Sequence, residues 1–293
     1  MKRMVLILAS LAVILEAKVN VVASYAYIAD LVKQVGGEEV SVSYLAKPTR
    51  DPHFIVPKPS FIAKVRNADL LIINGGELEI GWIPPLIAQA GNPDVQPGAQ
   101  GYVALSESVD MIDRPVVLSR TEGDVHPGGN PHFAVDMYQV PKMADAVTEG
   151  LCRIDAAHCE GYRTNRVRFV AEWNGKTREW EKRLEPLEGM KVIQAHKLFD
   201  YLLKNSSMVT VDTLEPIPGV PPTAKHIAKV IGTIKSQKIP MLITSVYFPV
   251  KSVELVKEKT GIRVVTLPHD VGAVEGSDTL DAMFERIVET IAP

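Results

Sequence analysis

The sequence predicts a two-lobed α/β protein, each lobe a mostly parallel sheet flanked by helices, with a long helix joining the lobes. Short β-branched segments alternate with segments of helical periodicity along the chain. The alternation pauses over a charged stretch at 160–187 and then starts again. Because such alternation is typical of parallel sheets covered by helices, two runs of it in 293 residues predict two such lobes.

The first run of alternation predicts an N-terminal lobe at 18–156. A β-branched segment at 19–23 predicts a strand, and helical spacing follows at 25–35. The segment 69–74 contains a continuous apolar run, which suits a strand covered on both faces. Ser60 stands in a capping position before a short helix. The remaining predictions here are strands at 40–45 and 102–105, that short helix at 60–65, a Gly- and Pro-rich loop at about 118–131 and a helix at 137–154 whose Pro141 lies near its start.

A long helix is predicted to link the lobes at 157–187. Trp173 and Trp180 are seven residues apart and therefore lie on one face of this helix. The many charged residues around them are suited to solvent. Such length with so much charge indicates a helix that crosses between two lobes.

The second run predicts a C-terminal lobe at 188–293. A rigid proline-rich loop at 216–222 precedes one of its amphipathic helices. The elements expected in this lobe are strands at 191–195, 208–212, 240–246 and 263–267, and helices at 199–204, 223–237, 250–260 and 278–291.

The N-terminus has the features of a cleaved signal peptide at 1–17. Lys2 and Arg3 precede an apolar run that is too short to span a bilayer comfortably, and Ala17 offers a small residue for cleavage. A buried first helix is the alternative reading. No cysteine lies at the cleavage region, so a lipid anchor there is not supported, and we expect a periplasmic protein. The formal net charge of −3 gives no basic patch for nucleic acid.

The two cysteines are candidates for a disulfide. On one continuous helix Cys152 and Cys159 would be roughly 10 Å apart along the axis, which is too far to bridge. A helix break between them would bring the thiols together, and an oxidising compartment then favours the bond. Two free buried thiols are the alternative.

Three histidines and one acid are candidate metal ligands. His53, His132 and His196 follow predicted strands or precede a helix, and Asp270 follows the last strand. Ligands of open α/β sheets bind beyond the carboxyl ends of the strands. Two candidates fall in each half of the chain, so facing lobes would bring all four to one cleft. Three imidazoles and one carboxylate form a complete tetrahedral set for zinc.

Each candidate also has a structural explanation, since a loop histidine is more often a hydrogen-bonding or surface residue, and an acid before Gly272 suits a turn. His126, in the glycine-rich loop, is either solvated or an auxiliary metal ligand. We expect His158 and His226 to be turn and helix-surface residues, and His269 to point away from its neighbour Asp270.

Taken in order, these motifs resemble a known family: the zinc- and manganese-specific substrate-binding proteins of bacterial ABC transporters (cluster A-I; ZnuA-, TroA- and AztC-like). The resemblance runs over about 19–291. The matching motifs are Asp51-Pro52-His53, Pro59-Ser60, Ala68-Asp69 with Asn74-Gly75, Asn130-Pro131-His132, His196 with Phe199 and Tyr201, the proline-rich segment 218–223, and Asp270.

The resemblance implies a protein that is not an enzyme and that delivers metal to an ABC permease from an interdomain cleft. It implies His53, His132, His196 and Asp270 as the ligands. A monomer is expected, and a periplasmic metallochaperone is a second candidate partner. Many zinc-specific members carry a long loop rich in His and acids before the second ligand, where this chain has only 122–126 with His126.

The donor set favours Zn²⁺ over Mn²⁺. Manganese-binding relatives typically place a carboxylate at the position of His196, and the harder manganese ion suits oxygen donors. We expect hydrogen-bond acceptors behind the imidazoles, with Tyr247 and Glu275 as candidates for these supporting roles.

Two other functions fit part of the pattern. A zinc hydrolase would use three histidines with an open position and Asp270 as base, but the sequence has neither His-Glu-x-x-His nor Gly-x-Ser-x-Gly. A binding protein for an iron chelate or cobalamin would need a wide cleft lined by aromatic residues or Arg.

Overall fold

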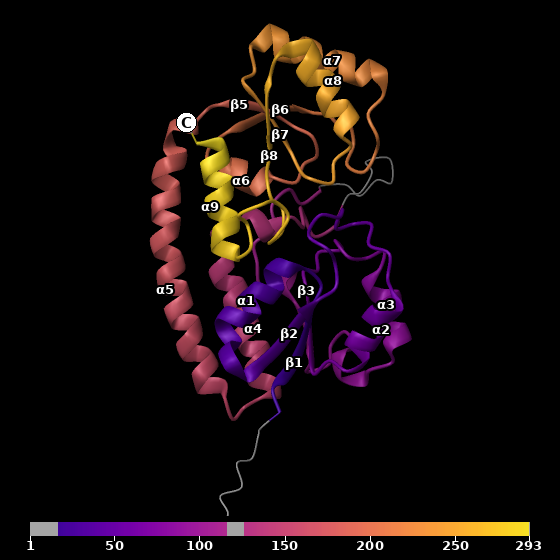
Figure 1. Cartoon of the computed structure of the whole chain (residues 1–293), viewed down its shortest axis with the longest axis vertical. Coiled ribbons are helices and arrows are strands. Elements are labelled where there is room, and N and C mark those ends of the chain that lie inside the picture. Colours follow the sequence, from indigo (N-terminus) through magenta and orange to yellow (C-terminus); the bar gives the residue numbers. More distant parts are fainter. Residues whose placement is uncertain (1–16, 116–125, 293) are drawn as a thin grey trace, which may run out of the picture.

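Two parallel four-stranded sheets form the framework of the two lobes (Figure 1). This computed structural model describes residues 17–115 and 126–292. The first sheet has the order β2-β1-β3-β4, and the second repeats it as β6-β5-β7-β8. The strands are β1 (Val19–Ala23), β2 (Val40–Tyr44), β3 (Leu70–Ile73), β4 (Tyr102–Ala104), β5 (Lys191–Gln194), β6 (Val209–Thr213), β7 (Met241–Thr244) and β8 (Arg263–Thr266). The predicted fold class is confirmed.

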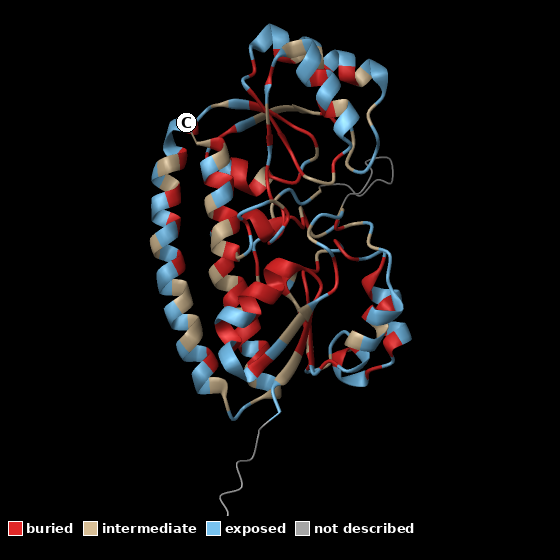
Figure 2. Ribbon diagram, in the orientation of Figure 1, coloured by how far each residue is buried: buried red, intermediate tan, exposed pale blue. Residues whose placement is uncertain are grey.

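Nine helices of the described residues surround these sheets. They are α1 (Ala26–Gly36), α2 (Pro59–Arg66), α3 (Ile83–Ala90), α4 (Val140–Ile154), α5 (Cys159–Leu184), α6 (Asp200–Asn205), α7 (Ala224–Gln237), α8 (Val250–Thr260) and α9 (Leu280–Ile291). Every residue of β3 and of β7 is buried, as expected for central parallel strands (Figure 2). Among the residues described, no helix is long and apolar enough to cross a bilayer.

The long helix α5 runs beside both lobes (Figure 1). Trp173 and Trp180 lie on its buried face with their ring centroids 5.2 Å apart. Phe284 of α9 packs against both rings, at 5.2 and 5.5 Å. The indole of Trp173 donates to the carbonyl oxygen of Met137, whereas that of Trp180 donates to Glu285. The last helix therefore returns from the second sheet to pack on α5. The lobe boundaries at 156 and 188 stay a prediction.

One capping prediction is wrong, and one helix was not predicted. Helix α2 begins at Pro59 with Lys58 before it, so Ser60 lies inside the first turn and caps nothing. Helix α3 was not predicted, because Pro84-Pro85 reads as a helix breaker. Both prolines lie in its first turn, where no intrahelical N–H bond is needed. Pro141 occupies the same kind of position in α4, as predicted.

The predicted helix break lies between α4, which ends at Ile154, and α5, which begins at Cys159. It brings the Cα atoms of Cys152 and Cys159 to 4.6 Å, and a disulfide joins them. The predicted signal peptide, apart from Ala17, and the loop residues 122–125 lie outside the described residues.

Candidate metal centre

Three histidines from separate loops meet between the carboxyl ends of the two sheets. His53 follows β2, His132 precedes a 3-10 turn at Phe133–Val135, and His196 follows β5. Their ring centroids are 5.1 to 5.7 Å apart, and one nitrogen of each lies within 4.8 Å of the others. The Nε2 atoms of His132 and His196 are 3.4 Å apart. Ligand nitrogens of a tetrahedral zinc ion with bonds near 2.05 Å would be about 3.3 Å apart.

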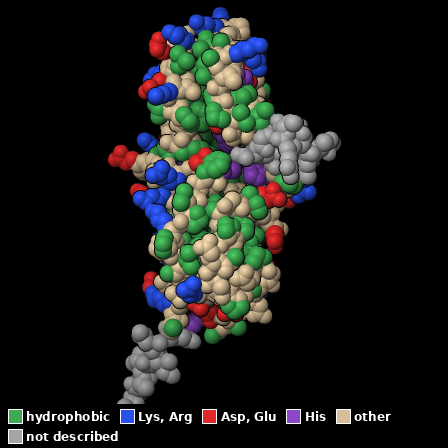
Figure 3. All heavy atoms as spheres, turned by 90° about the vertical axis from the view of Figure 1, so that its right-hand side faces the viewer, with side chains coloured by type: hydrophobic (Ala, Val, Ile, Leu, Met, Phe, Trp, Pro, Cys, Tyr) green, Lys and Arg blue, Asp and Glu red, His purple; other side chains and the backbone are tan. Residues whose placement is uncertain are grey.

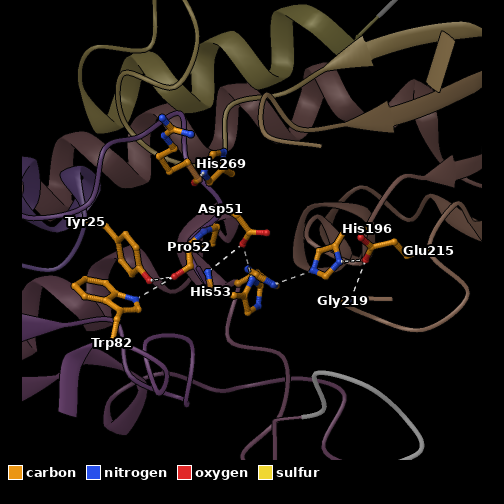
Figure 4. A network of polar contacts seen from close by, with 11 residues as sticks. Tyr25, Asp51, Pro52, His53, Trp82, His196, Glu215, Gly219 and His269 are labelled. Atoms are coloured by element: carbon orange, nitrogen blue, oxygen red, sulfur yellow. Dashed lines mark hydrogen bonds and ion pairs between the residues drawn. The ribbon is translucent and has the colours of Figure 1, made fainter. Parts of the chain in front are cut away.

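Two aromatic side chains of the first lobe hold the loop that carries His53. The phenol of Tyr25 and the indole of Trp82 both donate to the carbonyl oxygen of Pro52, at 2.9 and 3.2 Å (Figure 4). Their rings pack edge to face, 6.1 Å apart. Trp82 precedes the unpredicted helix α3, so this helix positions the first histidine.

A second hydrogen-bond network holds His132 and reaches both lobes. The backbone N–H of His132 donates to the side-chain oxygen of Asn130, at 2.9 Å. The amide of Asn74, at the end of β3, donates to the carbonyl oxygen of Pro131. Asn130 also donates to the carbonyl oxygen of Lys197, one residue after His196. The loops of His132 and His196 therefore touch across the lobes.

Carboxylates orient two of the imidazoles (Figure 4). Asp51 accepts from Nδ1 of His53 at 2.9 Å, and Glu215 accepts from Nδ1 of His196 at 2.7 Å. Glu215 also accepts from the backbone N–H of Gly219, which fixes the proline-rich loop. With Nδ1 protonated, the lone pair of each Nε2 points to the centre of the cluster, as in metal-bound histidines.

Sequence reasoning did not assign these supporting roles to Asp51 and Glu215. The Asp-x-His spacing of Asp51 was a usable signal, because such an acid can bond the ring two residues later. Glu215 gave none, since it meets His196 from a separate strand end. Of the two candidates named instead, Glu275 is exposed, and Tyr247 is not hydrogen bonded to any of the imidazoles.

Burial keeps the histidines able to bind a cation. It lowers the pKa of His132 well below its usual range, and nearby His53 and His196 lower it further. Burial likewise lowers the pKa of His126 to about 4. At neutral pH both rings are uncharged and present a lone pair, which is the form that binds metal.

His126 lies at the cluster. Its ring stacks on that of His53 with centroids 5.6 Å apart, and its buried Nε2 has no hydrogen-bond partner among the described residues. With the three other histidines it lines a cavity of about 250 Å³. Seen from the side, histidine side chains are visible at the waist between the lobes (Figure 3).

Asp270 lies beside the cluster but outside the group of three histidines. Its buried carboxylate accepts from the backbone N–H groups of Tyr27, Ala26 and Val271, at 2.7, 3.2 and 2.8 Å. It therefore caps the start of α1, and burial raises its pKa to about 7. It lines a small cavity with His132, so the carboxylate stands next to the second histidine.

The lining of the histidine cavity bears on the alternative functions. Apart from the histidines, its described lining residues are Asp113, Gly129, Asn130, Pro131, Lys197, Asp200 and Pro218. None of these is an aromatic residue or an arginine, which a cavity for an iron chelate or cobalamin would need. Four imidazoles around a small space instead match a single cation.

A family described as "Zinc-uptake complex component A periplasmic" matches residues 21–293. The chain is 24% identical to the manganese ABC transporter substrate-binding lipoprotein PsaA of Streptococcus anginosus, covering 94% of this chain and 88% of that protein. It is 25% identical to the iron-binding protein YfeA of Yersinia pestis, covering 94% and 86%. A crystal structure of ZnuA superposes with a TM-score of 0.75 at 22% identity, covering 93% of this chain and 99% of that one.

Proposed function

The chain belongs to the ZnuA family of periplasmic metal-uptake components, and we propose that the ion it captures and delivers is Zn²⁺. It is a metal-binding substrate-binding protein of an ABC transporter, a class that carries its cargo and does not transform it. Relatives are named for manganese and for iron, so the choice of ion has to come from the donor atoms of this chain.

The observation that carries the zinc proposal is the oriented group of three imidazoles. Nε2 of His53 is buried and without a partner, and Nε2 of His132 lies 3.4 Å from that of His196. Nitrogen donors suit zinc, whereas manganese prefers carboxylate oxygens. The two carboxylates fix the tautomer and the ring orientation of His53 and His196, which strengthens metal binding further.

We propose that Asp270 supplies the fourth ligand and that His126 is an auxiliary one. Among the described residues, Oδ2 of Asp270 accepts one hydrogen bond, at 3.2 Å from the backbone N–H of Ala26, so this oxygen is the easier one to redirect to a metal beside His132. His126 already faces the cavity with a free lone pair. The auxiliary histidine would hold an incoming ion until the carboxylate replaces it.

The partner in this proposal is a membrane permease of the ABC type, which receives zinc from the interdomain cleft. A periplasmic metallochaperone would be a source of the ion. We further propose that residues 1–17 are a signal peptide removed near Ala17, and that the exported protein acts as a monomer.

Elemental analysis tests the proposed ion. Purified protein is compared with the His196→Ala variant after both have been offered equal zinc, manganese and iron. We expect one zinc per wild-type chain, little manganese, and loss of zinc from the variant. Wild-type protein that takes up manganese in preference to zinc, or no metal at all, would overturn the proposal.

A further inference from the structure

Five buried side-chain atoms of the described residues have no hydrogen-bond partner, and they fall into two groups. Nε2 of His53 and of His126 face the metal cavity and are explained by it. The other three atoms belong to Ser245, Tyr247 and His269, at the carboxyl ends of β7 and β8. An unpaired buried hydroxyl is costly, so a native structure that keeps one calls for an explanation.

Tyr247 lies at the contact between the lobes. Its ring packs edge to face on His269, with centroids 4.9 Å apart. Nε2 of His269 lies 3.3 Å from the carbonyl oxygen of Arg50, in the loop that carries His53. Figure 4 shows His269 beside Asp51, on the same side of the cluster. The phenol therefore approaches the first-lobe loop from the second lobe.

The charges around the phenol identify its neighbours. Burial raises the pKa of Tyr247 well above its usual range, the negative charge of Asp51 raises it further, the neighbouring Ser245 side chain lowers it, and the negative charge of Glu215 raises it. These are the two carboxylates that orient His53 and His196. Asp51 uses only Oδ1 for its histidine, and its Oδ2 has no hydrogen bond within the described part of the chain.

We propose that Tyr247 is a positioning residue of the metal site, whose hydroxyl donates a hydrogen bond to Oδ2 of Asp51 when the ion is bound. The inference rests on the proposed function, because it concerns the loaded state of the same site. The ion draws His53 toward His196, and Asp51 moves with the imidazole that it holds. Tyr247 then links the second lobe to the carboxylate behind the first histidine.

Such a bond acts on metal affinity and leaves the metal-free protein unaffected. A contact that forms in only one of two states shifts the equilibrium toward that state. Loss of a hydrogen bond to a charged acceptor weakens zinc binding by roughly ten- to a hundredfold. Tyr247→Phe keeps the ring against His269 and removes an unpaired hydroxyl, so the melting temperature of the metal-free variant stays the same or rises.

The test compares zinc dissociation constants and metal-free melting temperatures of wild-type protein and Tyr247→Phe. The matched control is Tyr162→Phe, because the Tyr162 hydroxyl already donates to Asp155 beside the disulfide. We expect this control to lower the melting temperature and to leave zinc binding unchanged. For Tyr247→Phe we expect the opposite pattern.

A double-mutant cycle identifies the acceptor. If the phenol acts through Asp51, Tyr247→Phe has no further effect on zinc affinity in an Asp51→Ala background. Zinc affinity within twofold of wild type in Tyr247→Phe would overturn the inference, as would an undiminished loss in the Asp51→Ala background. Failure of wild-type protein to bind zinc would overturn the proposed function instead.

Discussion

Glu215 is the residue whose removal tests the second-lobe half of the site most directly. Its carboxylate lies 2.7 Å from Nδ1 of His196 and 3.1 Å from the backbone nitrogen of Gly219. In Glu215→Ala the ring loses the acceptor that fixes its tautomer and orientation, and the proline-rich loop loses its anchor. Outer-sphere partners of this kind contribute about ten- to a hundredfold in metal affinity, or about 1.4–2.8 kcal/mol.

The assay is competition for zinc against a chromophoric chelator at neutral pH. The matched control is Glu275→Ala, which removes an exposed carboxylate of the second lobe and is expected to bind zinc as wild type does. Circular dichroism checks that both variants fold. Glu215→Ala protein that keeps wild-type affinity, or a Glu275→Ala variant that loses as much, would refute the reasoning about oriented imidazoles.

Three further perturbations separate the roles of other residues. Asp270→Ala is expected to weaken zinc binding more than His126→Ala does. Because Asp270 also caps α1, this variant alone should lower the melting temperature of the metal-free protein. Calorimetry that finds the same zinc affinity and the same melting temperature for both variants would contradict this. Burial raises the pKa of Glu79 from 4.5 to about 7, so the folded state binds this proton more tightly than the unfolded chain. The free energy of unfolding of the metal-free protein therefore falls as the pH rises through this window, by up to about 3 kcal/mol. Urea unfolding should show a shallower fall in Glu79→Gln, and an unchanged slope would exclude Glu79 as the cause. Replacing Cys152 and Cys159 by serine should lower the free energy of unfolding by about 2–3 kcal/mol. Zinc affinity should stay unchanged, because the disulfide joins α4 to the start of α5, which is the end of α5 away from the contact between the lobes (Figure 1). A weakened zinc affinity would show that the two regions are coupled.

Much of the fold could be predicted because the spacing of apolar residues along the sequence indicates which faces of a strand or helix are buried. The run Leu70–Ile73 is apolar throughout and is a central strand, and α8 has its predicted bounds. The same pattern put His53 and His196 after strands and His132 before a helix, and the structure brings these three together. Helix α3 was missed because Pro84-Pro85 discourages a helix everywhere except in its first turn.

The supporting contacts of the site depend on long-range packing, which periodicity does not encode. Glu215 reaches His196 only because β5 and β6 are neighbours in the second sheet. Asp270 was predicted as a ligand from its place after the last strand, but nothing in the sequence indicates that the start of α1 would offer it two backbone N–H groups. Likewise, only the folded chain shows the ring of His126 stacked on that of His53.

In the proposed site, the Nε2 atoms of His53, His132 and His196 bind one zinc ion between the lobes. A crystal structure of zinc-loaded protein, with anomalous data on both sides of the zinc absorption edge, tests it most directly. We expect a single strong anomalous peak bonded to these three nitrogens at about 2.0–2.1 Å. A peak elsewhere, bonds through Nδ1, or a zinc ion held by fewer than three of these histidines would contradict it.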